Sequence, residues 1–167
     1  TSVRDEGVHS VIVDLRGNPG GNSLVANEFL RYLPVESYQV GRSTVRFGPV
    51  IWENQPGRQK NQQAEHVFSG DVYVLTSTDS FSAAMDFATL LSDNGLCTVV
   101  GEIPGNMPSS YGDVLHFQTP NALLAFTVSY KYFMRPDESK SNLPLLPDVQ
   151  ISANDALEEA LRLIHND

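Results

Sequence analysis

Three short runs of aliphatic and β-branched residues stand out in the hydrophobic pattern of the chain. They cover residues 11–13, 71–76 and 97–100, and their apolar residues follow one another without regular polar alternation. Continuous short runs of this kind are typical of strands that are covered on both faces, as in a parallel sheet. We therefore predict buried strands at these three positions.

Three longer segments, residues 23–33, 81–94 and 154–165, show the spacing of amphipathic helices. The first has a serine as its cap and a proline after its end, and the second is closed by Gly95, which are common helix boundaries. The side chains expected to face the core are Val25, Phe29, Leu30 and Leu33 in the first helix, Ala84, Phe87, Ala88, Leu90 and Leu91 in the second, and Ala156, Leu157, Ala160, Leu161 and Ile164 in the third.

Two strand-like segments late in the chain, residues 114–118 and 123–130, flank a Pro-Asn pair, which predicts a hairpin. Residues 148–151 are expected to form a last short strand. Residues 53–65 are rich in Gln, Asn and charge, so we expect an exposed loop there.

Strands that alternate with helices predict an α/β layered domain with a largely parallel sheet, to which the late hairpin adds antiparallel strands. The 167 residues are enough for one domain with its own core, and we treat residues 1–167 as a single domain.

The composition excludes several classes of function. The formal net charge is -9 and the eleven basic residues are scattered, which argues against nucleic-acid binding because phosphates require clustered Lys and Arg. No apolar run approaches the roughly 20 residues that span a bilayer, so no membrane span is expected. No pair of histidines has the spacing of metal ligands, and no metal is predicted.

Two strand-to-helix connections could carry chemistry. Residues 14–21 read Asp-Leu-Arg-Gly-Asn-Pro-Gly-Gly, whose glycines allow the backbone N–H groups to approach a ligand closely. Residues 76–84 form a Ser/Thr-rich turn that places Ser82 in the first helical turn, where an anion is stabilised by free N–H groups. Each feature alone is better explained as an ordinary strand-to-helix turn.

Together the two connections resemble the carboxyl-terminal processing (tail-specific) serine peptidase family, which includes the tricorn protease core. Gly101-Glu102 and Pro147-Asp148 match further motifs of this family, and the resemblance runs over nearly the whole chain. It implies a crotonase/ClpP-like layered fold and a serine endopeptidase that cleaves polypeptides without a cofactor. It assigns Ser82 as the nucleophile, and the oxyanion hole to the Ala83 N–H and the Gly20-Gly21 backbone.

The sequence departs from one branch of that family at the general base. Many members use a lysine within a Gly-Glu-x-Thr-x-Gly-Lys loop, but here Met107 stands where the lysine would be. The tricorn-like branch uses an upstream histidine and a downstream carboxylate, which would be Glu138, with Asp137 as the neighbouring alternative. His9 adjoins a predicted buried strand and is a poor candidate for the base.

The resemblance also implies that the chain is a catalytic-domain fragment. We expect the base and a peptide-binding domain to lie upstream, so the isolated segment should have little or no activity. Relatives suggest a location outside the cytoplasm: periplasm, cell envelope or medium. Two alternatives remain open, a non-catalytic ligand- or peptide-binding domain of the same fold and, more distantly, a crotonase-type acyl-thioester enzyme.

Overall fold

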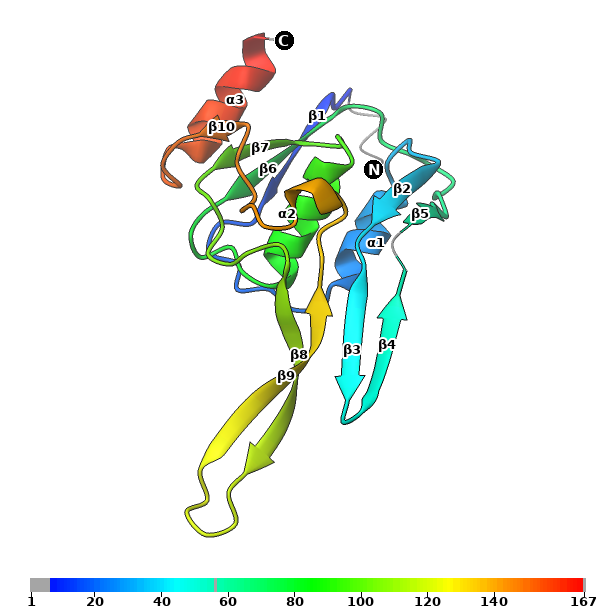
Figure 1. Ribbon diagram of the computed structural model, residues 1–167. Coiled ribbons are helices and arrows are strands. Elements are labelled where there is room, and N and C mark those ends of the chain that lie inside the picture. Colours follow the sequence, from blue (N-terminus) through cyan, green and yellow to red (C-terminus); the bar gives the residue numbers. More distant parts are fainter. Residues whose placement is uncertain (1–6, 56, 167) are drawn as a thin grey trace.

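The computed structural model describes residues 7–55 and 57–166 and has a four-stranded parallel sheet at its centre (Figure 1). The strand order is β1-β6-β7-β10, and all three neighbouring pairs are parallel. The strands are β1 (Ser10–Asp14), β6 (Asp71–Thr76), β7 (Thr98–Gly101) and β10 (Val149–Gln150). The predicted α/β class and largely parallel sheet are confirmed.

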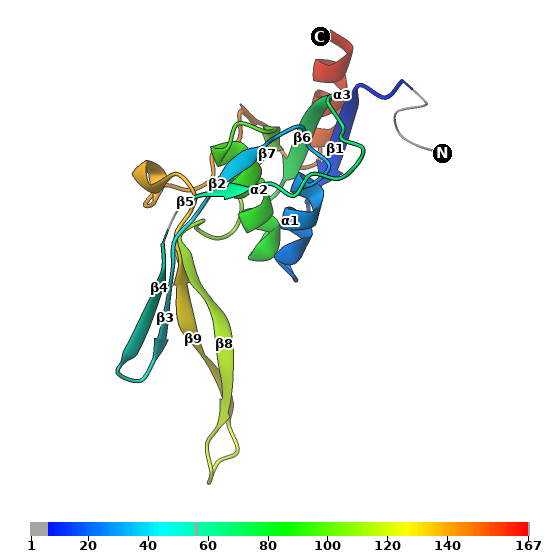
Figure 2. The same cartoon turned by 90° about the vertical axis from the view of Figure 1, so that its right-hand side faces the viewer.

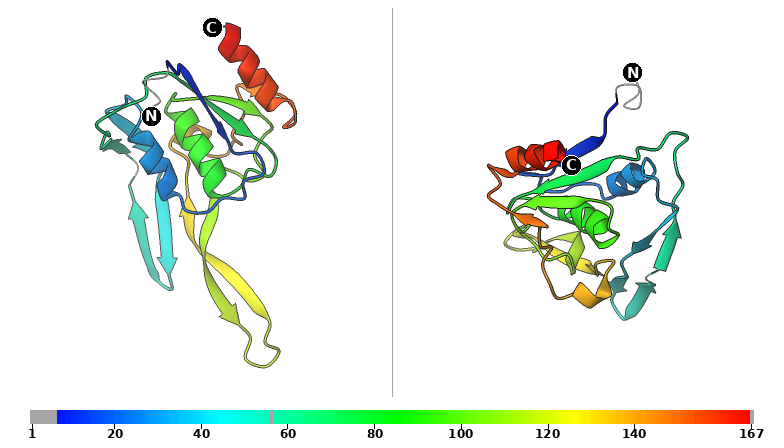
Figure 3. Two further views of the ribbon diagram at one scale, coloured as in Figure 1. Left: turned by 180° about the vertical axis from the view of Figure 1, so that it is seen from behind. Right: turned by 90° about the horizontal axis from the view of Figure 1, so that it is seen from above.

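Helices cover both faces of this sheet (Figure 3). Helices α1 (Leu24–Leu30) and α2 (Ala83–Asp93) pack on one face, and α3 (Ala156–Asn166) packs on the other. Along β6, Val72 and Val74 face α1 and α2, whereas Tyr73 and Leu75 face α3. Burial on both faces explains why this strand is apolar without alternation.

The helix faces differ in part from the expected ones. Val25 in α1 is 64% exposed, because Ala26 and Leu30, one turn apart, form the buried stripe of this short helix. In α3, Leu157 and Leu161 are 40% and 43% exposed. The fully buried residues there are the small alanines at 156 and 160, which allow the helix to lie close to the sheet and leave the leucines at the rim.

Antiparallel strands form two hairpins that project from this core (Figures 1 and 2). The long hairpin is confirmed, and its strands extend further than predicted. The projecting hairpins are β3 (Ser43–Phe47) with β4 (Val50–Asn54) and β8 (Ser110–Gln118) with β9 (Ala125–Phe133), and they form one sheet in the order β4-β3-β9-β8. Strands β2 (Ser37–Val40) and β5 (Gly57–Lys60) form a separate antiparallel pair. The expected exposed loop at 53–65 is wrong in part, because it contains the end of β4 and all of β5.

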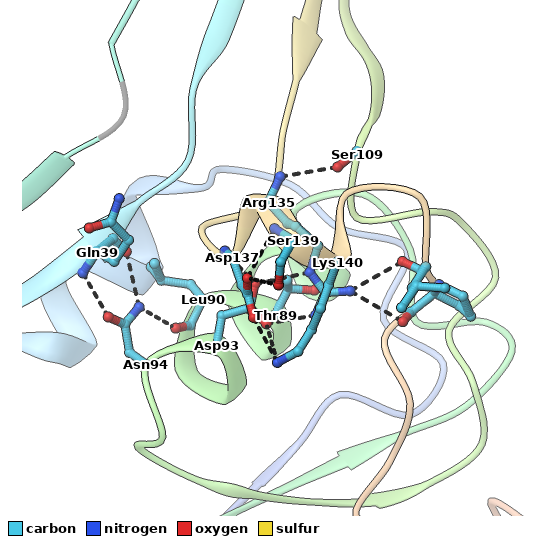
Figure 4. Close-up of polar contacts among 12 residues, drawn as sticks. Gln39, Thr89, Leu90, Asp93, Asn94, Ser109, Arg135, Asp137, Ser139 and Lys140 are labelled. Carbon is cyan, nitrogen blue, oxygen red and sulfur yellow. Dashed lines mark hydrogen bonds and ion pairs between the residues drawn. The ribbon is translucent and has the colours of Figure 1, made fainter.

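A buried ion pair joins the base of the long hairpin to α2 (Figure 4). Arg135 donates to both carboxylate oxygens of Asp93, at 3.0 and 2.6 Å, and the side chains are 3% and 0% exposed. Arg135 also donates to the carbonyls of Leu143 and Pro144. The Asp137 N–H donates to the same Asp93 carboxylate. This network fixes the end of β9 and the following 3-10 helix η1 (Glu138–Lys140) against α2.

Across residues 7–55 and 57–166, no helix combines the length and apolar character needed to cross a bilayer.

The Asp93–Arg135 pair generates a stability prediction. Arg135→Met should lower the free energy of unfolding by about 3 to 5 kcal/mol, because it leaves a buried carboxylate without its main partner. Urea unfolding followed by circular dichroism measures the change. The matched control is Arg162→Met, which removes an equally bidentate pair with Glu159 from the surface of α3 and should barely move the midpoint. Equal losses in the two variants would contradict the assigned role of Arg135.

Candidate active site

The carboxyl ends of three parallel strands lie side by side at one edge of the sheet. Asp14 at the end of β1 is in register with Leu75 of β6, and Thr76 of β6 is in register with Gly101 of β7. The loops that follow these strands therefore share one edge, which is where open α/β sheets bind ligands.

Hydrogen bonds tie the first two of these loops together. The fully buried Ser80 hydroxyl donates to the Leu15 carbonyl at 2.7 Å, and the Gly17 N–H donates to the Ser77 hydroxyl at 3.1 Å. The Phe81 N–H donates to the carbonyl of Asn18 at 3.0 Å. The Gly-Gly loop and the Ser/Thr-rich turn are thus one rigid unit.

Ser82 lies exposed at the start of α2 with an unusual backbone conformation. Its φ of 51° and ψ of -125° place a non-glycine residue in the left-handed region, which costs roughly 1–3 kcal/mol and is found mostly at functional sites. The Ser82 N–H donates to Asn106 Oδ1 at 3.0 Å, and its hydroxyl makes no capping hydrogen bond to the helix. A sharp strand-to-helix turn that presents a free serine hydroxyl is the arrangement of a nucleophile elbow.

Gly20 lies directly against this serine. Its φ is 102°, and a Cβ at this position would be 2.7 Å from the Phe81 carbonyl oxygen, 2.8 Å from Ser82 Cβ and 2.9 Å from Ala83 N. A side chain at residue 20 is therefore excluded by space as well as by backbone conformation. The structure brings the double glycine and Ser82 to one place.

The amides near Ser82 differ in availability. The Gly20 N–H donates to Asn18 Oδ1 at 2.9 Å, so it is already engaged within its own loop. The N–H groups of Gly21 and Ala83 have no hydrogen-bond acceptor among the described residues. Two free backbone donors beside an exposed hydroxyl can stabilise a negatively charged oxygen.

A cavity of about 470 Å³ opens beside Ser82, and Gly21 and Ala83 line it as well. Its other walls come from the start of β3, the body of α2, the loop at residues 106–108 and the base of the β8–β9 hairpin.

The carboxylate expected near the serine is not among the cavity-lining residues. Glu138 lies in η1 with its side chain 45% exposed, and its carboxylate is 3.8 Å from the Nε of Arg42, which does line the cavity. The neighbouring Asp137 caps η1, and hydrogen bonds from Ser139 and Lys140 lower its pKa to about 2. Asp137 therefore has a local structural role, and Glu138 reaches the cavity only through Arg42.

No histidine of the chain supplies a base in this cavity. All four histidines lie in the described residues, and none lines the cavity. His9 precedes β1 at the opposite edge of the sheet. Lys131 of β9 does line the cavity, but its Nζ lies 3.4 Å from the Asp113 carboxylate and over the ring of Phe133. These contacts hold the Lys131 side chain away from the role of a base for Ser82.

A half-buried carboxylate that the sequence analysis missed lines the same cavity. Asp86 lies four residues after Ser82 in the first turn of α2, on the same helix face. Its pKa is raised to about 6, mainly by burial and also by the negative charge of Asp113, while the positive charge of Lys131 opposes the shift. In the sequence Asp86 looks like an ordinary acidic residue of a first helical turn, and its spacing from Ser82 was the available signal.

Over the described part of the chain, no three His, Cys, Asp or Glu side chains are grouped so that they could hold a metal ion.

Comparison with known proteins gives a family and a fold. A family model described as Peptidase family S41 matches residues 1–151, which confirms the resemblance carried by the two loops. Mature CPAF complexed with lactacystin has a TM-score of 0.76 at 18% identity, over 99% of this chain and 46% of that one. A candidate peptidase from Parabacteroides merdae has a TM-score of 0.73 at 21% identity, over 95% and 53%.

The photosystem II D1 C-terminal processing protease has a TM-score of 0.63 at 18% identity, over 96% of this chain and 40% of that one. These TM-scores show a shared fold. The present chain spans about half the length of the proteins it matches.

The environment of Asp86 generates a pH-dependent stability prediction. Its folded pKa of about 6 lies above the ordinary value of 3.8, so the folded state binds the proton more tightly than the unfolded chain does. This contribution is present below about pH 4 and is lost as pH rises through about 6, at a cost of up to about 3 kcal/mol. Asp86→Asn should therefore stabilise the protein at pH 7.5 and not at pH 3.5.

Urea unfolding at the two pH values measures this difference. The control is Asp79→Asn, which changes an exposed carboxylate in the preceding turn and should give no pH-dependent gain. A stabilisation by Asp86→Asn that is the same at both pH values would contradict the assignment.

Proposed function

Since this chain belongs to peptidase family S41, we propose that it carries the nucleophile of a serine endopeptidase that cleaves polypeptide chains. Ser82 Oγ attacks the carbonyl carbon of a peptide bond, and a base removes the hydroxyl proton. The resulting oxyanion accepts hydrogen bonds from the N–H groups of Ala83 and Gly21. Proton transfer to the leaving amine then gives an acyl-enzyme, which water hydrolyses.

The contact of Gly20 with Ser82 and Ala83 is the observation that carries this proposal. In support of it, the exposed Ser82 and the unengaged N–H groups of Gly21 and Ala83 belong to residues that line the same cavity. Gly20 supplies the space for this approach, and its own N–H stabilises the loop.

The general base is proposed to come from outside these 167 residues. The four histidines of the chain are away from the cavity, and Lys131 is engaged with Asp113. Relatives of the same fold are about twice as long, which leaves room for a further segment or a peptide-binding domain. In this proposal an upstream histidine enters the cavity and Glu138, released from its long contact with Arg42, orients it.

Labelling of the full-length protein tests the assignment of the nucleophile. A fluorophosphonate probe should modify Ser82, and Ser82→Ala should abolish both labelling and cleavage of an unfolded protein such as reduced casein, with a loss of at least about 10³-fold in rate. Ser92→Ala, at the other end of α2, is the matched control and should keep both. Labelling at another residue, or cleavage that persists in Ser82→Ala, would refute the proposal. Peptide binding without any labelling would favour the non-catalytic alternative.

The close approach of Gly20 gives a second test. Gly20→Ala should reduce the rate of Ser82 labelling by at least about tenfold, because the methyl group displaces the nucleophile or the Ala83 amide from its productive position. Gly48→Ala in the turn between β3 and β4 is the control, since Gly48 also has a positive φ of 57° but nothing within 4 Å of an added Cβ. Comparable losses in both variants would show that backbone strain, rather than the contact at Ser82, is responsible.

A further inference from the structure

The cavity beside Ser82 contains one carboxylate without a charged partner. Each cation that lines the cavity already has a carboxylate within 4.0 Å, whereas Asp86 has neither an ion pair nor a side-chain hydrogen bond with any described residue. The cation pairs are Arg42 with Glu138, Lys131 with Asp113, and Arg135 with Asp93.

The position of Asp86 relative to Ser82 is fixed by the helix. The Asp86 N–H donates to the Ser82 carbonyl at 2.9 Å, so the carboxylate lies one turn further along the same face of α2. One turn rises about 5.4 Å, a distance that the side chain of lysine or arginine can span. Leu90 and Phe133 also line the cavity and would contact the aliphatic part of such a side chain.

We propose that this cavity is the subsite for the substrate residue that contributes the attacked carbonyl, and that Asp86 makes it selective for lysine or arginine. The inference rests on the proposed peptidase function and adds the class of substrate. A cationic side chain would supply the missing charge partner, and its N–H groups would donate charge-assisted hydrogen bonds to Asp86. The elevated pKa of Asp86 is consistent with a carboxylate that lacks such a partner in the free protein.

The other titratable groups on the cavity wall do not compete for this role. Arg42, Lys131 and Arg135 each have a carboxylate partner, which is Asp113 in the case of Lys131, and the Tyr111 ring packs edge-on against Tyr132. A neutral or acidic substrate side chain at this position would leave Asp86 desolvated and unpaired, which disfavours its binding.

Matched peptides that differ by one charge test this preference. Peptides with arginine or with citrulline, its uncharged isostere, before the scissile bond are compared by kcat/KM with the full-length protein. Arginine should be preferred about 10- to 100-fold, as expected for a charge-assisted hydrogen bond. In Asp86→Asn this ratio should fall to about one, whereas Asp79→Asn should keep it.

The ratio of the kcat/KM values for the two peptides also distinguishes substrate recognition from other roles of Asp86. Equal rates on the two peptides in the wild-type protein would overturn the proposal. This outcome does not depend on whether any variant folds. A lower rate of Asp86→Asn on both peptides with an unchanged ratio would also overturn it, because Asp86 would then position the base rather than the substrate.

Binding measured without catalysis separates this inference from the proposed function. In Ser82→Ala, fluorescence anisotropy should show the same preference for the arginine peptide, and Ser82→Ala with Asp86→Asn should lose it. If the wild-type protein cleaves neither peptide but binds the arginine peptide more tightly, the subsite is supported and the peptidase assignment fails. If both peptides are cleaved at equal rates, the subsite fails and the peptidase assignment stands.

Discussion

The close approach of the Gly20 backbone to Ser82 and Ala83 is the constraint on which the arrangement of the site depends. The parallel sheet brings the two loops to the same edge, but only a residue without a Cβ can lie against Ser82 there. The left-handed conformation of Ser82 is unfavourable by itself. It is held by the hydrogen bonds of Ser80 and Phe81 to the glycine loop, and the bond from Ser80 to Leu15 is buried.

Two parts of the fold form the site. The parallel sheet and α2 position Ser82 and the free amides, whereas the base of the long antiparallel hairpin supplies the facing wall, including Lys131. These parts are distant in sequence, and the Asp93–Arg135 pair joins them directly (Figure 4). Removal of one member of such a pair is costly because the other charge is left buried without its partner, so the pair holds the hairpin against α2. The facing wall is therefore tied to α2 at the end of the helix opposite Ser82.

Features that depend only on residues close together in the sequence could be predicted from the sequence. The strand at 71–76 was predicted at its observed bounds because a continuous apolar run suits a doubly covered strand. Ser82 and the double glycine were found because their motif is short and close to strand ends. The exposure of Leu157 and the partial burial of Asp86 could not be predicted in this way, since both depend on which distant surface packs against the helix. Glu138 was chosen by its place along the chain, which does not reveal its distance from the cavity.

Several polar groups that line the cavity beside Ser82 have no hydrogen-bond partner within residues 7–55 and 57–166. In the described residues, no fully buried side-chain nitrogen or oxygen lacks a hydrogen-bond partner. The Ser82 hydroxyl, the N–H groups of Gly21 and Ala83, and the Asp86 carboxylate are unpaired, and all four residues line one cavity. Ser82 and Gly21 are exposed and Ala83 and Asp86 are half-buried, so water can satisfy these groups in the free protein. A bound substrate that displaces this water would complete the same hydrogen bonds and balance the charge.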